Sequence, residues 1–223
     1  MKKRSCYLWL AALFMFTAAM QAPAKQRIVF FGDSITQMGV NEGGYIRLIQ
    51  KKLDEKGKAS AYDLLGAGVG YNKVYDLFLR LEKDVVAQKP QVVLIWIGVN
   101  DVGHKSIGTG TDADKFEAFY NAIINRLKEI NAKLVLVTPA VIGERTDCTN
   151  AMDGDLNRYA QIVRKLAAQH NCGIIDMRQQ FMAYNLVHNP DNQEKGILTT
   201  DGIHLTEQGN KLVADVIFKA LNL

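Results

Sequence analysis

Three side chains of this sequence have the types and spacing that nucleophilic catalysis needs. Ser34 lies in a tight turn, Phe-Gly-Asp-Ser-Ile, directly after a short apolar run. A hydroxyl is a weak nucleophile unless a base removes its proton, so this interpretation depends on a histidine. His204 follows Asp201 by three residues in Asp-Gly-Ile-His, which lets the carboxylate fold back onto Nδ1 and leaves Nε2 facing the serine. Together the three residues predict acyl transfer through a serine.

Ser34, Asp201 and His204 also have simpler explanations. A serine in a tight turn often caps a helix, and the Asp-x-x-His pair could cap the next helix or bind a metal. A metal site needs more ligands, and no H-x-x-x-H, H-x-H or D-x-H pattern occurs in the chain. The sequence therefore predicts neither a metal nor a cofactor. We assign structural roles to His170, at the end of a predicted helix, and to His188, in a predicted polar loop.

Two further motifs carry donors that could meet a developing oxyanion. A tetrahedral intermediate holds its negative charge on the former carbonyl oxygen. The candidate donors are the backbone N–H of Ser34, the N–H groups near Gly70 and the side-chain amide of Asn100. Taken singly, the glycine-rich segment 66–72 also fits a flexible turn, and Asn100-Asp101 also fits a turn after a strand.

The first 24 residues have the organisation of a secretory signal peptide. Three basic residues, Lys2 to Arg4, precede an apolar run that ends in Ala22-Pro23-Ala24. A run of about 14 residues is shorter than the ~20 that a spanning helix needs, so we expect no stable membrane anchor. Cys6 precedes the run, which argues against a lipoprotein. We predict a protein that is exported, periplasmic or secreted, after cleavage near Ala24, with residues 25–223 as one domain.

The composition is that of an ordinary globular domain. The chain has 223 residues, of which 48% are hydrophobic and 22% charged, and a formal net charge of +4. The leader contains three of the 27 basic residues and none of the 23 acidic ones, so its removal nearly abolishes the basic excess. No basic stripe with interleaved aromatics is present, and we expect no nucleic-acid partner. Pairing of Cys148 with Cys172 and the oligomeric state are left open.

Buried strands that alternate with amphipathic helices must position these motifs. Runs that are apolar on both faces are typical of strands inside parallel sheets. The predicted strands are 28–31, 62–65, 92–97, 134–137 and 173–176, and the predicted helices lie near 44–56, 72–87, 112–130, 155–169 and 206–222. Thr111-x-x-Asp114 and Thr206 are predicted helix caps.

This alternation predicts a three-layer α/β/α sandwich with right-handed crossovers. We expect a five-stranded parallel sheet of flavodoxin-like order, 2-1-3-4-5. Ligands of such sheets bind beyond the carboxyl ends of the strands. The motifs of Ser34, Gly70 and Asn100 each follow a strand and that of His204 precedes the last helix, so all four are expected at one edge.

The four motifs, in this order, resemble the four sequence blocks of the SGNH hydrolase family, also called GDSL-type esterases and lipases. The similarity spans roughly Arg27 to Leu221, and the rhamnogalacturonan acetylesterase-like and lysophospholipase L1-like members are the most similar subgroup. The resemblance implies an SGNH hydrolase fold with Ser34 as the nucleophile and His204 as its base. It also implies Asp201 as the partner of the base and Asn100 as an oxyanion donor.

One block departs from the family pattern. Counted from the strand, the position of the family's oxyanion glycine falls on Tyr71 rather than on Gly70. A backbone N–H can serve from either residue, so both are candidates at this point. The ring of Tyr71 would also lie near the acyl pocket.

The resemblance implies a serine esterase that forms an acyl-enzyme on a small-molecule or polysaccharide ester. Polar segments at 143–154 and 188–196, and the absence of a long apolar lid, favour short acyl groups such as acetyl on carbohydrate. Lysophospholipases and thioesterases of the same family are alternatives. Two alternatives come from other classes. A metallophosphoesterase would need metal ligands, and a non-catalytic carbohydrate-binding protein would lack one of Ser34, Asp201 and His204.

Overall fold

The computed structural model describes residues 25–223, so the predicted signal peptide, residues 1–24, lies outside the described residues. One parallel sheet runs through the molecule in the order β2-β1-β3-β4-β5, which confirms the predicted order. The strands are β1 (Gln26–Gly32), β2 (Tyr62–Gly68), β3 (Val92–Trp96), β4 (Lys133–Val137) and β5 (Gly173–Ile175).

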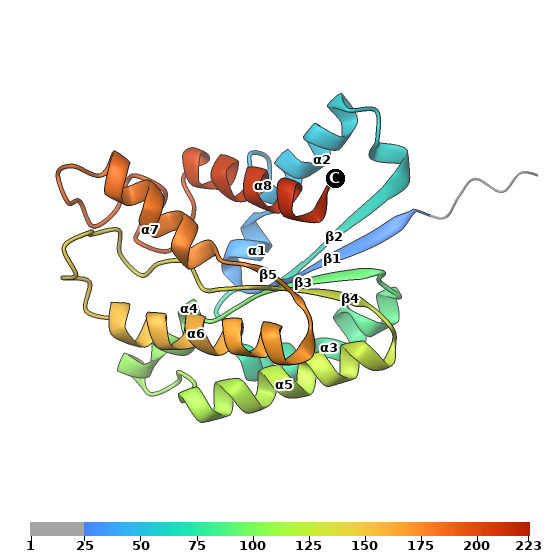
Figure 1. Ribbon diagram of the computed structural model, residues 1–223, viewed down its shortest axis with the longest axis horizontal. Coiled ribbons are helices and arrows are strands. Elements are labelled where there is room, and N and C mark those ends of the chain that lie inside the picture. The colour runs from blue at the N-terminus through green and yellow to red at the C-terminus, as the bar shows by residue number, and fades with distance from the viewer. Residues whose placement is uncertain (1–24) are drawn as a thin grey trace, which may run out of the picture.

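Helices cover both faces of the sheet and make the predicted three layers (Figure 1). On one face lie α3 (Val74–Asp84), α5 (Ala113–Glu129) and α6 (Asp153–His170); on the other lie α2 (Tyr45–Glu55) and α8 (Glu207–Leu221). The remaining helices are α1 (Ser34–Met38), α4 (Val99–Gly103) and α7 (Met177–His188), with 3-10 turns at Ala59–Ala61, Val86–Gln88 and His104–Ile107.

Burial falls from the centre of the sheet to its edges. Every residue of β3 is buried, because helices pack on both of its faces. The edge strand β2 is only partly buried, and in β5 Gly173 and Ile174 are exposed. The apolar runs therefore predict the central strands best, as expected where both faces contribute to the core.

Two local predictions at helix ends had different outcomes. Thr206 caps α8 as predicted, since its hydroxyl accepts the Gly209 N–H at 3.0 Å. The capping box at Thr111 and Asp114 is wrong: Asp112 holds the N-cap position of α5, without a side-chain cap bond. The Thr111 N–H donates to the Asp101 carbonyl, and the Tyr159 hydroxyl donates to the Thr111 carbonyl. These bonds hold Thr111 one residue before the N-cap position.

Helix α7 was missed by the sequence analysis. His188 ends this helix rather than lying in a polar loop, because the chain continues helically beyond β5. Its apolar residues do not all face the core: Met182, Leu186 and Val187 are exposed, so the segment lacks a clear amphipathic pattern. His170 ends α6 as predicted.

The two cysteines of the described chain are free thiols, and Cys148 is exposed. Within residues 25–223, no helix has both the length and the apolar character needed to cross a membrane.

Candidate active site

Ser34 is fixed where β1 passes into α1. It is the first residue of the helix, and the carboxylate of Asp33 caps that helix by accepting the Ile35 N–H at 3.0 Å. The end of β2 packs directly against this turn, because a Cβ on Gly68 would lie 2.1 Å from the Gln37 nitrogen. Glycine is therefore required at this position, and the two strand ends together hold the serine at the edge of the sheet.

Two buried carboxyl groups lie close to the serine turn. Asp33 is 2% exposed, and burial raises its pKa to about 7. Asp101 is fully buried, and burial raises its pKa to about 6. One Asp101 oxygen accepts the Val74 N–H at 3.1 Å, which ties the start of α3 to α4, the helix that follows β3. Asp33 directly precedes Ser34 and Asp101 directly follows Asn100, so both acids lie at the edge of the sheet that carries the candidate residues.

His204 and Asp201 reach Ser34 from the opposite end of the sequence. The Nε2 of His204 lies 2.9 Å from the Oγ of Ser34, and its Nδ1 lies 2.7 Å from Oδ2 of Asp201. The other Asp201 oxygen accepts the backbone N–H groups of Ile203 and His204 at 3.0 and 2.8 Å. The structure thus brings the three predicted residues into one hydrogen-bonded chain in the predicted order.

The Asp201 carboxyl is held in its ionised form. Partial burial raises its pKa, but the hydrogen bonds from His204 and from the backbone outweigh that effect, and the net pKa is lowered. An ionised carboxylate on Nδ1 favours the tautomer in which Nε2 can accept the proton of Ser34.

The side-chain amide of Asn100 lies on α4, at the end of β3. It is 7% exposed, and its Nδ2 donates to the carbonyl of Asn72 at 3.1 Å. An amide nitrogen has two hydrogens, so this bond orients the group and leaves the second donor for a ligand. The helix can begin there because Gly98 adopts a φ of 132°.

The turn after β2 distinguishes the two backbone donors left open by the sequence. The Gly70 N–H already donates to the Gln37 side chain at 2.7 Å. The Tyr71 N–H, by contrast, donates to no other group among residues 25–223. Tyr71 has a φ of 63°, a conformation that costs a bulky residue energy and that often marks a functional turn. The geometry therefore favours Tyr71 as the donor.

Side chains that the sequence analysis did not select stabilise this turn. The Lys73 ammonium, 8% exposed as a residue, donates to the Tyr71 carbonyl at 2.9 Å and lies near Asp76. Gln37 holds Gly70 from α1. Neither belongs to a motif, and only their proximity in sequence to Ser34 and Tyr71 could have indicated them.

The arrangement contains the parts required for acyl transfer. Ser34 supplies a hydroxyl, His204 a proton acceptor, and Asn100 with the free backbone N–H groups a set of donors for a negative oxygen. Among the described residues, no group of three or more His, Cys, Asp or Glu side chains is placed to hold a metal ion.

The chain is similar to known proteins over most of its length. A model of the GDSL-like lipase/acylhydrolase family matches residues 30–212. The chain is similar to an acetylxylan esterase of Geobacillus stearothermophilus, with 26% identity over 91% of this chain and 96% of that protein. It is also similar to the isoamyl acetate-hydrolyzing esterase 1 homolog of Rattus norvegicus, with 24% identity over 84% of this chain and 78% of that protein.

Solved structures give a nearer match. The crystal structure of the acetyl xylan esterase AlAXEase is 56% identical, with a TM-score of 0.87, and the match covers 87% of this chain and 99% of that one. A second structure, of the α/β hydrolase LAE5 from the metagenome of Lake Arreo, is 25% identical with a TM-score of 0.79 and covers 89% of this chain and 96% of that one.

Proposed function

Because the chain belongs to the GDSL-like lipase/acylhydrolase family and is a serine carboxylic-ester hydrolase, we propose that it removes acetyl groups from carbohydrate esters. One observation carries the reaction: the continuous hydrogen bonding from Asp201 through His204 to Ser34, with heavy-atom distances of 2.7 and 2.9 Å.

The reaction proceeds in two halves. The Oγ of Ser34 attacks the ester carbonyl while Nε2 of His204 takes its proton, and Asp201 stabilises the imidazolium that forms. His204 then gives the proton to the leaving alcohol, and an acyl-enzyme remains. A water molecule, deprotonated by His204, attacks that acyl group. Collapse of the second tetrahedral intermediate releases the carboxylic acid, and His204 returns its proton to the Oγ of Ser34.

The oxyanion of both intermediates needs donors that are already in place. We assign this role to the free amide hydrogen of Asn100 and to the backbone N–H groups of Ser34 and Tyr71. A preorganised donor is worth about 10²–10³ in rate, because no reorganisation accompanies the charge development.

The carbohydrate part of the proposal has three supports. The first is the 56% identity to the acetyl xylan esterase AlAXEase. The second is an open groove of about 290 Å³ that adjoins Asp201, lined by polar residues such as Arg145, Thr149 and Asn150 and by apolar ones such as Ile142 and Met152. The polar side chains of this groove can hydrogen-bond the hydroxyl groups of a sugar. The third is Tyr71, which is 78% exposed as a residue and follows the strand adjacent to that of Ser34, so that its ring offers a flat apolar surface for a pyranose ring.

Substrate profiling tests this proposal. Residues 25–223 are assayed on aryl esters from acetyl to decanoyl and on acetylated xylooligosaccharides. We expect highest activity on acetyl, release of acetate from the oligosaccharides, and covalent labelling of Ser34 by a fluorophosphonate. Preference for decanoyl would instead indicate a lysophospholipase or thioesterase. Ser34→Ala should abolish turnover, while Ser60→Ala, at an exposed serine, should retain it.

We also propose that the protein is exported, periplasmic or secreted. The support is the basic, then apolar, then small-residue order of residues 1–24. Expression of the full chain in a bacterium, followed by N-terminal sequencing of the periplasmic and medium fractions, should find a mature chain that begins at Lys25. Recovery of only uncleaved cytoplasmic protein would contradict export.

A further inference from the structure

The carboxylate of Glu144 is buried outside the active site and has an unusual set of partners. The residue is 1% exposed and lies in the loop between β4 and α6. Its Oε2 accepts the Ile197 N–H at 2.9 Å, and its Oε1 accepts the N–H groups of Leu198 and Thr199 at 2.6 and 2.9 Å. Three backbone donors therefore converge on one side chain.

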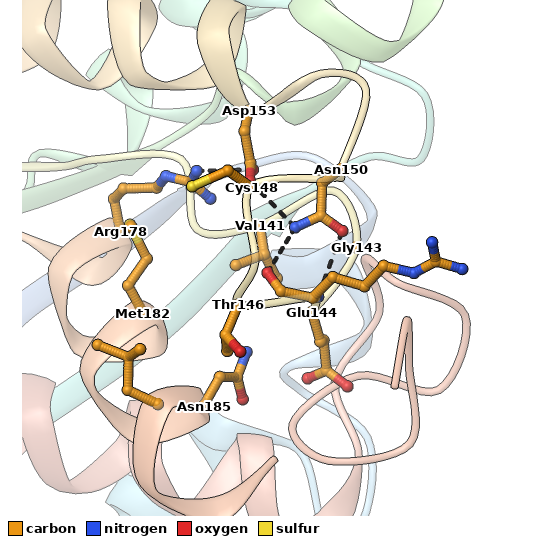
Figure 2. A pocket seen from close by; sticks show the side chains of 12 residues that line it. Val141, Gly143, Glu144, Thr146, Cys148, Asn150, Asp153, Arg178, Met182 and Asn185 are labelled. Carbon is orange, nitrogen blue, oxygen red and sulfur yellow. Dashed lines mark hydrogen bonds and ion pairs between the residues drawn. The ribbon is translucent and has the colours of Figure 1, made fainter. Parts of the chain in front are cut away.

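No lysine or arginine of residues 25–223 forms an ion pair with Glu144. The adjacent Arg145 pairs instead with Glu194 at the surface. Figure 2 shows the Glu144 carboxylate directed away from Arg178 and Asp153, toward the chain beyond α7. A buried charge is costly unless hydrogen bonds replace its hydration, so these backbone donors account for its presence.

The segment held by Glu144, residues 197–199, is one arm of a small hairpin that spans residues 197–206. Thr199 bridges Leu205 in antiparallel fashion, and the Thr206 N–H donates to the Leu198 carbonyl at 2.9 Å. At the tip, the Thr200 N–H donates to the His204 carbonyl at 2.7 Å. The turn closed by this last bond is the one that carries Asp201 and His204.

The opposite side of the hairpin is anchored by the neighbour of Glu144. The Gly143 N–H donates to the Gly202 carbonyl at 2.9 Å, and both glycines have positive φ values, 90° and 97°. A Cβ on Gly202 would lie 3.3 Å from the Gly143 nitrogen, so the two backbones approach closely. Gly143 thus contacts the hairpin at its tip, and Glu144 contacts it at its arm.

A buried amide extends the same attachment. The side chain of Asn189, 2% exposed, donates to the carbonyls of Glu144 and Gln193 at 2.9 and 2.8 Å. Its oxygen accepts the Gln193 N–H at 2.8 Å. The start of the segment that leads to the hairpin is therefore fixed to the same loop.

We propose that Glu144 is a positioning residue for the reaction: its carboxylate fixes the backbone at 197–199 so that the hairpin tip presents Nε2 of His204 to Ser34. The inference rests on the proposed roles of His204 and Asp201. No strand of the sheet includes this hairpin, so its contacts with the loop that carries Gly143 and Glu144 set its place. A shift of about 1 Å between reacting groups can lower the rate about 10²-fold, which is why such an anchor matters.

Glu144→Gln tests the proposal with little change in shape. Whichever way the new amide turns, its NH₂ faces at least one of the three backbone N–H groups, donor against donor. We expect kcat on an aryl acetate to fall by about 10- to 100-fold with KM changed by less than about threefold, since positioning and not binding is lost. The rate of Ser34 labelling by a fluorophosphonate should fall by a similar factor.

Asp176→Asn is the matched control. Its carboxylate also accepts several hydrogen bonds, from Arg164, Thr138 and the Gln179 N–H, but it lies at the start of α7 and touches neither the hairpin nor Ser34. This variant should lower the melting temperature and leave kcat within about twofold when assayed well below that temperature. A merely structural role for Glu144 would give the two variants the same behaviour.

The outcomes separate this inference from the proposed function. If the wild-type chain neither hydrolyses esters nor labels at Ser34, the proposed function fails. If it does both, and folded Glu144→Gln keeps kcat and labelling within about twofold, only the role of Glu144 is overturned.

Hydrogen exchange on the wild-type chain keeps the proposal testable if Glu144→Gln does not fold. The amides of Ile197, Leu198 and Thr199 should exchange as slowly as those of β3, although they lie in a loop, because the carboxylate holds them. Fast exchange at these three amides would overturn the proposal.

Discussion

Ser34, Tyr71 and Asn100 follow three adjacent strands, β1, β2 and β3, whereas His204 and Asp201 lie in a hairpin that belongs to no strand of the sheet. The first group is placed by the regular backbone ladder of a parallel sheet. The second is placed by loop contacts: backbone N–H groups donate to the side chains of Glu144 and Asn189, and the Gly143 N–H donates to the Gly202 carbonyl. Two different kinds of framework thus meet across one 2.9 Å hydrogen bond.

We call the residues that follow strands the sheet half of the site, and Asp201 with His204 its hairpin half. The electrostatics of these two halves also differ. On the sheet side, burial raises the pKa of Asp33 to about 7 and that of Asp101 to about 6. On the hairpin side, partial burial opposes the shift, but hydrogen bonds lower the pKa of Asp201. The sheet half contains acids that favour the protonated form, while the hairpin half keeps an anion beside its histidine. Aspartate is therefore favoured in its protonated form in the buried sheet half and in its ionised form in the hairpin half.

The largest expected effect comes from breaking the contact between the halves. Ser34→Ala and His204→Ala should each lower kcat by about 10⁴-fold or more, and the double variant should be no slower than the worse single one, because the two groups act as a unit. Burst and steady-state kinetics on an aryl acetate measure this. If the two losses multiplied, the halves would be acting independently.

The sheet half alone is probed by Asn100→Ala. Removal of one preorganised donor should lower kcat by about 10²–10³ with KM nearly unchanged, since the oxyanion forms only in the transition state. Asn121→Ala is the control, because Asn121 contacts His170 away from the site. Equal kcat in wild type and Asn100→Ala would remove Asn100 from the oxyanion site.

Asp33→Asn tests the electrostatic difference. Between pH about 4 and 7 the folded protein keeps a proton on Asp33 that the unfolded chain releases, so this group's stabilisation is complete at low pH and is lost as pH rises through that window. Relative to the variant, the wild-type free energy of unfolding should fall by about 1.4 kcal/mol per pH unit there. Urea unfolding from pH 4 to 8 measures the difference, and a flat difference would contradict the raised pKa.

The smallest effect is expected at Tyr71. Glycine adopts positive φ without strain and keeps the backbone N–H, so Tyr71→Gly should leave kcat on an aryl acetate within about threefold. Activity on acetylated xylooligosaccharides should fall more, because the exposed ring is lost. Comparison of kcat/KM on the two substrates checks this. An equal loss on both would indicate that the ring has no part in sugar binding.

The sequence predicts the sheet half better than the hairpin half. Apolar runs mark strands by local pattern, and the residues that follow them reach one edge by the geometry of parallel sheets, so the placement of Ser34 and Asn100 followed from both. The pair of Asp201 and His204 was also recognisable, because their contact spans only three residues. These signals are local, and local signals can be read from one sequence.

What could not be predicted depends on distant contacts. Glu144 meets its partners 53 to 55 residues further along the chain, and no spacing rule connects them. The choice of Tyr71 over Gly70 required the position of Gln37 on another element. The prediction of a helix cap at Thr111 was wrong because Tyr159 and Asp101, which lie outside the helix, fix the backbone of Thr111 by hydrogen bonds. In each case tertiary contacts decide a local outcome.

The 170 residues that separate Ser34 from His204 in sequence have a consequence for biosynthesis. Ribosomes deliver a polypeptide from its amino end, so all five strands emerge before the imidazole does. The nucleophile and every strand of the sheet are therefore synthesised before the base that the proposed reaction needs. On the proposed mechanism, esterase activity requires translation to pass the final hairpin, because a product halted earlier lacks His204.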